Sequence, residues 1–189
     1  MNLSDAKHSL ICSMLALNRI AEDLEYSGAF CGSISLLAQS DTIWFTGLGK
    51  SGLVAQRGAS MMRTIGRRSQ FIHPVDALHG DMGCINDRDV IIALSHSGET
   101  VEVREFLAWK STVPVIALCR LGSGLASRAR YTLKVDADEK LPTISCMMQN
   151  AWIDALVIAL SDNVEQVLQK THPSGDIGRR LRESGPREP

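Results

Sequence analysis

VIIALSHSGET, at residues 90–100, joins an unbroken apolar run to a cluster of polar and small residues. Five successive apolar residues without alternation are typical of a parallel β-strand that is buried on both faces. Three hydroxyl side chains follow, and a helical pattern over 101–110 begins directly after them. Hydroxyl groups beside the free N–H groups of a helix N-terminus favour an anion, which indicates a phosphate site at 95–100. An isolated Ser-x-Ser-Gly could equally well be a helix N-cap only.

A second strand-turn-helix pattern lies upstream. Ile43–Thr46 predicts a strand, GLGKSG at 47–52 a tight glycine turn, and Leu53–Thr64 the helix that follows. Two such corners at neighbouring strand ends predict one ligand held between them. The turn does not match a nucleotide P-loop, which needs four residues between its first glycine and the Gly-Lys pair.

The other apolar patterns extend this alternation of strands and helices. They predict strands at 70–72, 115–118 and 131–135, with helices at 101–110 and 123–129 between them. Such alternation predicts an α/β fold with a parallel sheet covered on both faces. We expect a single domain over 1–189, with a helical arm at about 1–40, a sheet core at about 41–136, and C-terminal helices and a tail at about 140–189.

Two long helical patterns flank the sheet core. Residues 4–26 carry apolar side chains at helical spacing, which predicts an amphipathic arm suited to packing against a partner subunit. Residues 145–170 are predicted to be largely helical, with an apolar face formed by Ala151, Ala155, Ile158 and Ala159. We expect this second helix to close the fold.

Composition limits the partners and the compartment. The chain of 189 residues is 44% hydrophobic and 22% charged, and its net charge of −1 gives no electrostatic reason to expect nucleic acid. Its five cysteines have no CxxC spacing, so we expect neither a disulfide framework nor a zinc cluster, but a reducing cytoplasm. The apolar run at 10–17 is too short for a membrane span and lacks the basic flank of a signal peptide.

Four stretches resemble, in the same order, the sugar isomerase (SIS) domain of arabinose-5-phosphate isomerases. They are GLGKSG at 47–52, FIHPVDALHGDMG at 71–83, ALSHSGET at 93–100 and THPSGDIGRR at 171–180. The resemblance implies a three-layer α/β/α sandwich of flavodoxin-like type with a five-stranded parallel sheet. It also implies a homotetramer with sites shared between subunits, and no cofactor. The implied reaction interconverts ribulose 5-phosphate and arabinose 5-phosphate and supplies Kdo-type sugars for lipopolysaccharide or capsule. Longer members continue into a pair of cystathionine-β-synthase-type domains, which we expect to be missing here.

The implied chemistry assigns roles to four residues. An enediol isomerase needs a base at carbon, a hydroxyl-proton shuttle, stabilisation of the enediolate and a grip on the phosphate. By motif position, Lys50, Glu99, Glu139 and His172 match residues that the family is thought to use in catalysis. We predict Glu139 as the carbon-proton base, Lys50 as electrostatic stabiliser, and His172 as an aid to ring opening in a neighbouring subunit's site. Glu99 could have a catalytic role, or its negative charge could merely stabilise the N-terminus of the following helix through the helix dipole.

Further residues are candidates for substrate binding. They are Gly49, Ser51, His79, Ser95, His96, Ser97 and Thr100. His79 matches a family histidine near the site and could bind a metal. However, no ligand cluster surrounds it in sequence, so a loop histidine is at least as good an interpretation and no metal is expected. His96 stands where the family commonly has asparagine.

Less specific interpretations remain open for several of these residues. The charged residues at 136–140 could be a solvated surface run, and Lys50 could be a surface lysine. Trp44, Trp109 and Trp152 fit core or interface positions better than a sugar-stacking platform. Two other functions are a different SIS reaction, such as that of 6-phospho-3-hexuloisomerase, and a non-catalytic sugar-phosphate sensor. The presence of all four catalytic candidates argues against the sensor.

Overall fold

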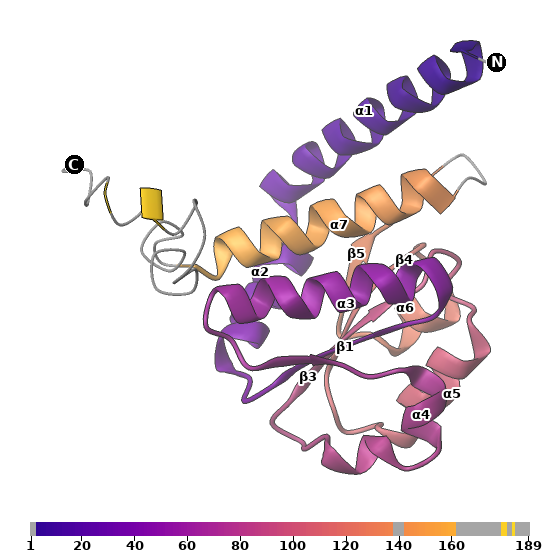
Figure 1. Cartoon of the computed structure of the whole chain (residues 1–189). Helices are drawn as coiled ribbons and strands as arrows, with labels where there is room; N and C mark the ends of the chain where they lie inside the picture. The colour runs from indigo at the N-terminus through magenta and orange to yellow at the C-terminus, as the bar shows by residue number, and fades with distance from the viewer. Residues whose placement is uncertain (1–2, 138–141, 162–178, 181–182, 184–189) are drawn as a thin grey trace.

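Five parallel strands form the centre of the fold, in the order β2-β1-β3-β4-β5. The computed structural model describes residues 3–137, 142–161, 179–180 and 183 (Figure 1). The strands are β1 (Ile43–Gly47), β2 (Ser69–Phe71), β3 (Val90–Leu94), β4 (Val115–Cys119) and β5 (Tyr131–Lys134). The helices are α1 (Leu3–Tyr26), α2 (Gly28–Gln39), α3 (Gly49–Thr64), α4 (Pro74–Leu78), α5 (Val101–Trp109), α6 (Gly124–Arg128) and α7 (Pro142–Ala159), with a 3₁₀ helix at Asp81–Cys84.

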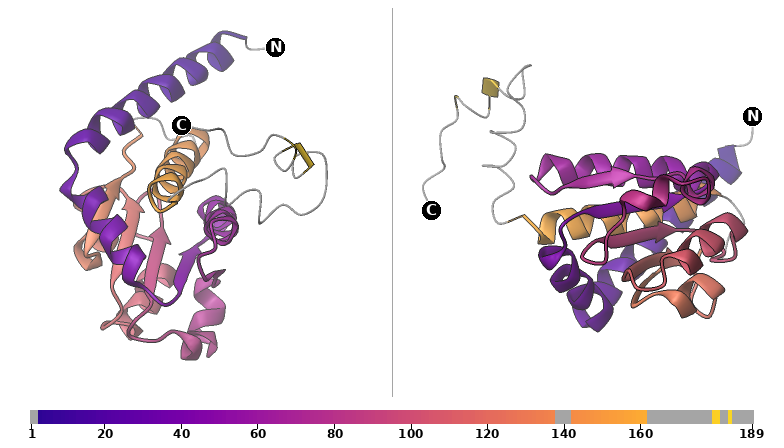
Figure 2. Two further views of the ribbon diagram at one scale, coloured as in Figure 1. Left: turned by 90° about the vertical axis from the view of Figure 1, so that its left-hand side faces the viewer. Right: turned by 90° about the horizontal axis from the view of Figure 1, so that it is seen from below.

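Helices cover both faces of this sheet, which confirms the predicted three-layer α/β architecture (Figures 1 and 2). Every residue of β1, β3 and β4 is buried, as expected of central parallel strands. Alternate side chains enter two different cores: Phe45 joins the core beneath α1, α2, α3 and α7, and Trp44 joins the core beneath α4, α5 and α6. The prediction of one domain over 1–189 includes residues outside the described ranges and stays a prediction.

The predicted N-terminal arm consists of two helices. Ser27 separates them: its backbone is extended and its Oγ accepts a hydrogen bond from Phe30 N at 3.1 Å, which caps α2. The first half of α1 projects beyond the sheet (Figure 1), and large apolar side chains along it are exposed, including Leu10 at 68% and Met14 at 66%. Ala16 and Ile20, in the second half, are buried in the core, and Cys12 and Leu24 pack against it.

The prediction for the apolar face of α7 is right for Ala151 and Ala155, which are partly buried against the core, and wrong for Ile158 and Ala159. Ile158 is exposed and Ala159 is exposed as well, whereas Ile144, Met148, Trp152 and Leu156 form the buried face. The larger apolar side chains of α7 lie at 144, 148, 152 and 156, and they contribute most of the burial energy and set which face is buried. The predicted extension of this helix over 162–170 lies outside the described residues.

Two of the three tryptophans are core residues, as predicted. Trp44 donates through Nε1 to Asp89 Oδ2 at 3.0 Å, and Trp152 donates through Nε1 to Lys134 O at 2.8 Å. Trp109, at the end of α5, is 74% exposed and therefore does not belong to the core. Within the described ranges no helix combines the length and apolar content needed to span a membrane.

Candidate active site

The two predicted strand-helix corners are neighbours at the carboxyl-terminal edge of the sheet. Gly47, the last residue of β1, is paired with Leu94, the last residue of β3. A Cβ on Gly47 would lie 3.0 Å from Leu94 O and 3.1 Å from the backbone of Ser51, so the close approach of α3 to the strands requires glycine here. The helix begins at Gly49 and not at the predicted Leu53. Gly49, Lys50 and Ser51 therefore belong to its first turn.

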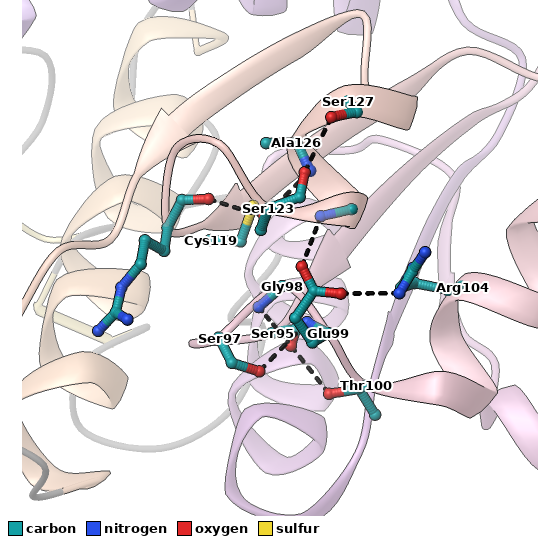
Figure 3. Close-up of polar contacts among 12 residues, drawn as sticks. Ser95, Ser97, Gly98, Glu99, Thr100, Arg104, Cys119, Ser123, Ala126 and Ser127 are labelled. Carbon is teal, nitrogen blue, oxygen red and sulfur yellow. Dashed lines mark hydrogen bonds and ion pairs between the residues drawn. The ribbon is translucent and has the colours of Figure 1, made fainter.

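The serine-rich stretch 95–100 forms a turn that is braced from within (Figure 3). Ser95 is buried, its Oγ accepts from Gly98 N at 3.1 Å, and it lies 2.8 Å from Thr100 Oγ1. Ser97 is exposed, and its Oγ accepts from Glu99 N at 3.2 Å, which leaves the hydroxyl hydrogen to donate to a ligand. Thr100 precedes α5 without a side-chain cap bond, so it leaves the first N–H groups of the helix to another acceptor.

Glu99 holds this turn to the start of α6. Its Oε1 accepts from Gly124 N at 2.7 Å, and its Oε2 accepts from Arg104 Nη1 at 2.7 Å (Figure 3). Both carboxylate oxygens thus already accept charge-assisted or backbone hydrogen bonds. This geometry supports a positioning role for Glu99 more than proton transfer at carbon.

The loop between β4 and α6 is a third strand-helix corner that packs against the turn. Leu125 N donates to Gly98 O at 3.0 Å, and Arg120 N donates to His96 O at 3.1 Å. Gly98 has φ +72°, and a Cβ there would overlap Ser123 Oγ, so the turn can pack on Ser123 only with glycine at position 98. The strand at 115–118, the glycine-containing loop and the helix at 123–129 repeat the pattern of the first two corners. That repetition is the signal by which the sequence could have revealed this corner.

Burial keeps two cysteines near the site in the thiol form. It raises the pKa of Cys119, against the hydrogen bond with Ser123, and the negative charge of Glu99 raises it further. It also raises the pKa of Cys146, on α7, where the positive charge of Lys50 opposes the shift. Neither thiol is set up as a nucleophile at neutral pH.

The surroundings of His96, the histidine of the turn, favour its neutral form. Burial lowers the pKa of His96 and the positive charge of Arg120 lowers it further, whereas Asp136 acts in the opposite direction. Its Nδ1 is buried and has no hydrogen-bond partner among the residues that the structure describes. A neutral imidazole can form a wall of a sugar pocket without adding charge.

The remaining candidates are not brought together by the described structure. His79 is exposed at the end of α4, after the edge strand β2. Across the described ranges, no three histidine, cysteine, aspartate or glutamate side chains are grouped closely enough to hold a metal ion. Glu139 and His172 lie outside the described residues.

The sequence of this chain matches the model of a known protein family. The model of the SIS domain matches residues 36–159, from the end of α2 to the end of α7. The chain belongs to the SIS domain family. This membership confirms the resemblance on which the sequence-based expectations rested.

Several SIS relatives are named for one reaction. Arabinose 5-phosphate isomerase KdsD of Pseudomonas aeruginosa is 34% identical in an alignment of 158 positions that covers 77% of this chain and 48% of that protein. Arabinose 5-phosphate isomerase KpsF of Escherichia coli is 31% identical in an alignment of 192 positions that covers 95% of this chain and 58% of that protein. The chain thus spans about half the length of the curated relatives it matches.

Solved SIS structures match nearly the whole chain. A protein of Escherichia coli CFT073 in complex with arabinose 5-phosphate is 28% identical, with a TM-score of 0.68 over 97% of this chain and 100% of that chain. The Vibrio vulnificus NanR protein complexed with ManNAc-6P is 20% identical, with a TM-score of 0.75 over 96% of this chain and 70% of that chain. The second similarity establishes the fold alone.

Proposed function

We propose that this SIS chain is an aldose-ketose isomerase that interconverts D-ribulose 5-phosphate and D-arabinose 5-phosphate through an enediol. The observation that carries the proposal is the braced turn at 95–100, whose exposed Ser97 hydroxyl and uncapped α5 N-terminus suit a phosphate. The names of the relatives, and the arabinose 5-phosphate complex of one protein of similar structure, supply the substrate class.

We assign a role to each candidate site residue. The phosphate lies on Ser97, Thr100 and the first turn of α3, where Gly49 and Ser51 stand. Ser95 holds the turn in shape and does not contact the phosphate, because its hydroxyl is already hydrogen-bonded to Gly98 N and Thr100 Oγ1. Lys50 stabilises the enediolate oxygen, and His79 and His96 contribute to the pocket wall.

Proton transfer is assigned to residues outside the turn. Glu139 takes the proton from C2 of arabinose 5-phosphate and returns it to C1, while the O2 hydroxyl proton moves to O1, so the reaction needs no external oxidant. His172 assists opening of the sugar ring from a neighbouring subunit. Glu99 positions the turn, because both of its oxygens are bound by Gly124 N and Arg104.

The proposal is tested by incubating the purified protein with a panel of pentose and hexose phosphates and following aldose-ketose conversion by NMR. Conversion between ribulose 5-phosphate and arabinose 5-phosphate is expected. Conversion of a 6-phosphohexulose instead would identify the other SIS reaction. Binding of sugar phosphates without any conversion would identify a sensor.

Ser97→Ala is expected to raise KM with little change in kcat. Loss of one hydrogen bond to a charged phosphate costs about 1.5–3 kcal/mol, which corresponds to a KM increase of about tenfold to a hundredfold. Steady-state kinetics measure both constants. Ser35→Ala, which removes an exposed hydroxyl of α2 that donates to Cys31 O, is the matched control. An unchanged KM in Ser97→Ala would place the phosphate elsewhere.

We also propose a homotetramer, in a reducing cytoplasm that suits five free cysteines. The exposed apolar side chains of α1 support association, because isolated folded chains rarely leave such a row in contact with water. Light scattering at micromolar concentration is expected to give a mass close to four chains. A monomeric mass would contradict both the assembly and the contribution of His172 from a neighbour. The supply of Kdo-type sugars for lipopolysaccharide or capsule belongs to the same proposal.

A further inference from the structure

The phosphate turn supplies donors but no free positive charge. Ser95, Ser97 and Thr100 contribute neutral hydroxyls, and the carboxylate of Glu99 is occupied by Gly124 N and Arg104. A phosphate monoester carries between one and a half and two negative charges at about pH 7. Hydrogen bonds from a cation to such a group are about twice as strong as neutral ones. A cation beside the turn would therefore add much to binding.

Three arginines belong to α5, α6 and the corner packed on the turn, and two of them are committed elsewhere. Arg104 is paired with Glu99 at 2.7 Å. Arg128 donates through Nη2 to three backbone carbonyls, those of Lys110 at 2.7 Å, Val113 at 3.0 Å and Ser111 at 3.2 Å. Its guanidinium therefore holds the end of α5 and the loop that follows.

Arg120 is the third arginine, and its guanidinium is loosely held. Its Nε lies 3.9 Å from Asp136 Oδ1, beyond hydrogen-bond distance, and its side chain is 54% exposed. The other oxygen of Asp136 has a cation of its own, Lys134, at 3.5 Å. Asp136 would thus keep a partner if Arg120 turned to a ligand, and the exposed pair itself is worth little.

The backbone places Arg120 directly beside the turn. Its N–H donates to the carbonyl of His96, which is the second residue of the turn. Arg120 and His96 extend β4 and β3, and strand alternation puts both on the face of Leu118 and Leu94, which is covered by α3 and α7. The first turn of α3, with Lys50, begins at the same edge and on the same face. The positive charge of Arg120 is close enough to His96 to help keep that imidazole neutral.

We propose that Arg120 binds the phosphate of the substrate from the β4 side of the turn and thereby selects phosphorylated sugars. This inference rests on the proposed function, because it takes 95–100 as the phosphate site. It assigns the charge that the turn lacks to a residue that neither the motifs nor the family resemblance had indicated.

Arg120→Gln is the test. KM for arabinose 5-phosphate and Ki for inorganic phosphate are both expected to rise about tenfold to a hundredfold, the loss expected for one charged hydrogen bond, while kcat changes less than about threefold. Arg120→Lys keeps the positive charge but cannot form bidentate hydrogen bonds to phosphate. It is expected to recover part of the lost phosphate affinity. Disturbance of the sugar pocket alone would raise KM and leave the Ki of inorganic phosphate unchanged.

Arg88→Gln is the matched control. Arg88 is also an exposed arginine paired with an aspartate, Asp41, but it precedes β3 at the opposite edge of the sheet. Its loss changes the net charge equally and is expected to change neither constant. Calorimetric titration of each variant with inorganic phosphate tests Arg120 independently of turnover. Absence of turnover in the parent protein would refute the proposed function, whereas equal phosphate affinity in the parent protein and Arg120→Gln would overturn the role of Arg120.

Discussion

Glu139→Gln is expected to lower kcat by about a hundredfold or more and to leave KM nearly unchanged. Glutamine keeps the size and the hydrogen-bonding capacity of glutamate but lacks a basic oxygen, and a positioned general base contributes about 10²–10⁴-fold to the rate. Steady-state kinetics in both directions measure the loss. In deuterated water, deuterium should also stop entering the substrate at the carbon next to the carbonyl.

Two further variants make this assignment specific. Glu105→Gln removes an exposed carboxylate of α5 and should behave like the parent protein. Glu99→Gln should act mainly on KM, because the carboxylate holds the turn through Gly124 N and Arg104. Deuterium entry at the parental rate in Glu139→Gln, together with its loss in Glu99→Gln, would exchange the roles of the two glutamates.

Gly98→Ala is expected to be the most damaging substitution in the turn. The residue has φ +72°, which costs an L-residue about 1–2 kcal/mol, and the added methyl would overlap Ser123 Oγ, which adds about 1–3 kcal/mol. We expect the free energy of unfolding to fall by about 2–5 kcal/mol and KM to rise by at least the factor expected for Ser97→Ala. Denaturant unfolding and steady-state kinetics measure the two effects.

Gly66→Ala separates the two causes. Gly66 has φ +80°, but no atom lies within 4 Å of an added Cβ, so only the conformational cost applies. Adding Ser123→Gly to Gly98→Ala removes the blocking side chain and should restore part of the stability. Equal destabilisation by the Gly66 and Gly98 substitutions would show that the packing on Ser123 is unimportant.

The strands and the location of the turn could be predicted because they depend on local sequence. Val90–Leu94 is apolar at every position, and a central parallel strand is buried at every position. The glycines at 47–52 predict a turn and a helix from Leu53, whereas α3 begins four residues earlier, at Gly49. Propensity alone places helix ends poorly, because the strands beside them decide where the first turn fits.

The bracing of the turn could not be predicted, because it depends on pairing between distant residues. Glu99 and Gly124 are brought together by the register of β3 against β4 and by the length of the loop after β4. Arg120 is placed beside His96 by the same register. The sequence shows the residue types, but only the order of the strands in the sheet determines which side chains meet.

In the proposed assembly, the exposed apolar half of α1 would link the stability of this protein to its concentration. Side chains such as Leu10 and Met14 contribute little to the free energy of unfolding while they contact water, and they would contribute more once another chain of that assembly covered them. The melting temperature of such a chain is then not a single constant, since dilution alone lowers it. The free energy of unfolding of one chain would then include contacts with other chains, and a low protein concentration would by itself reduce it.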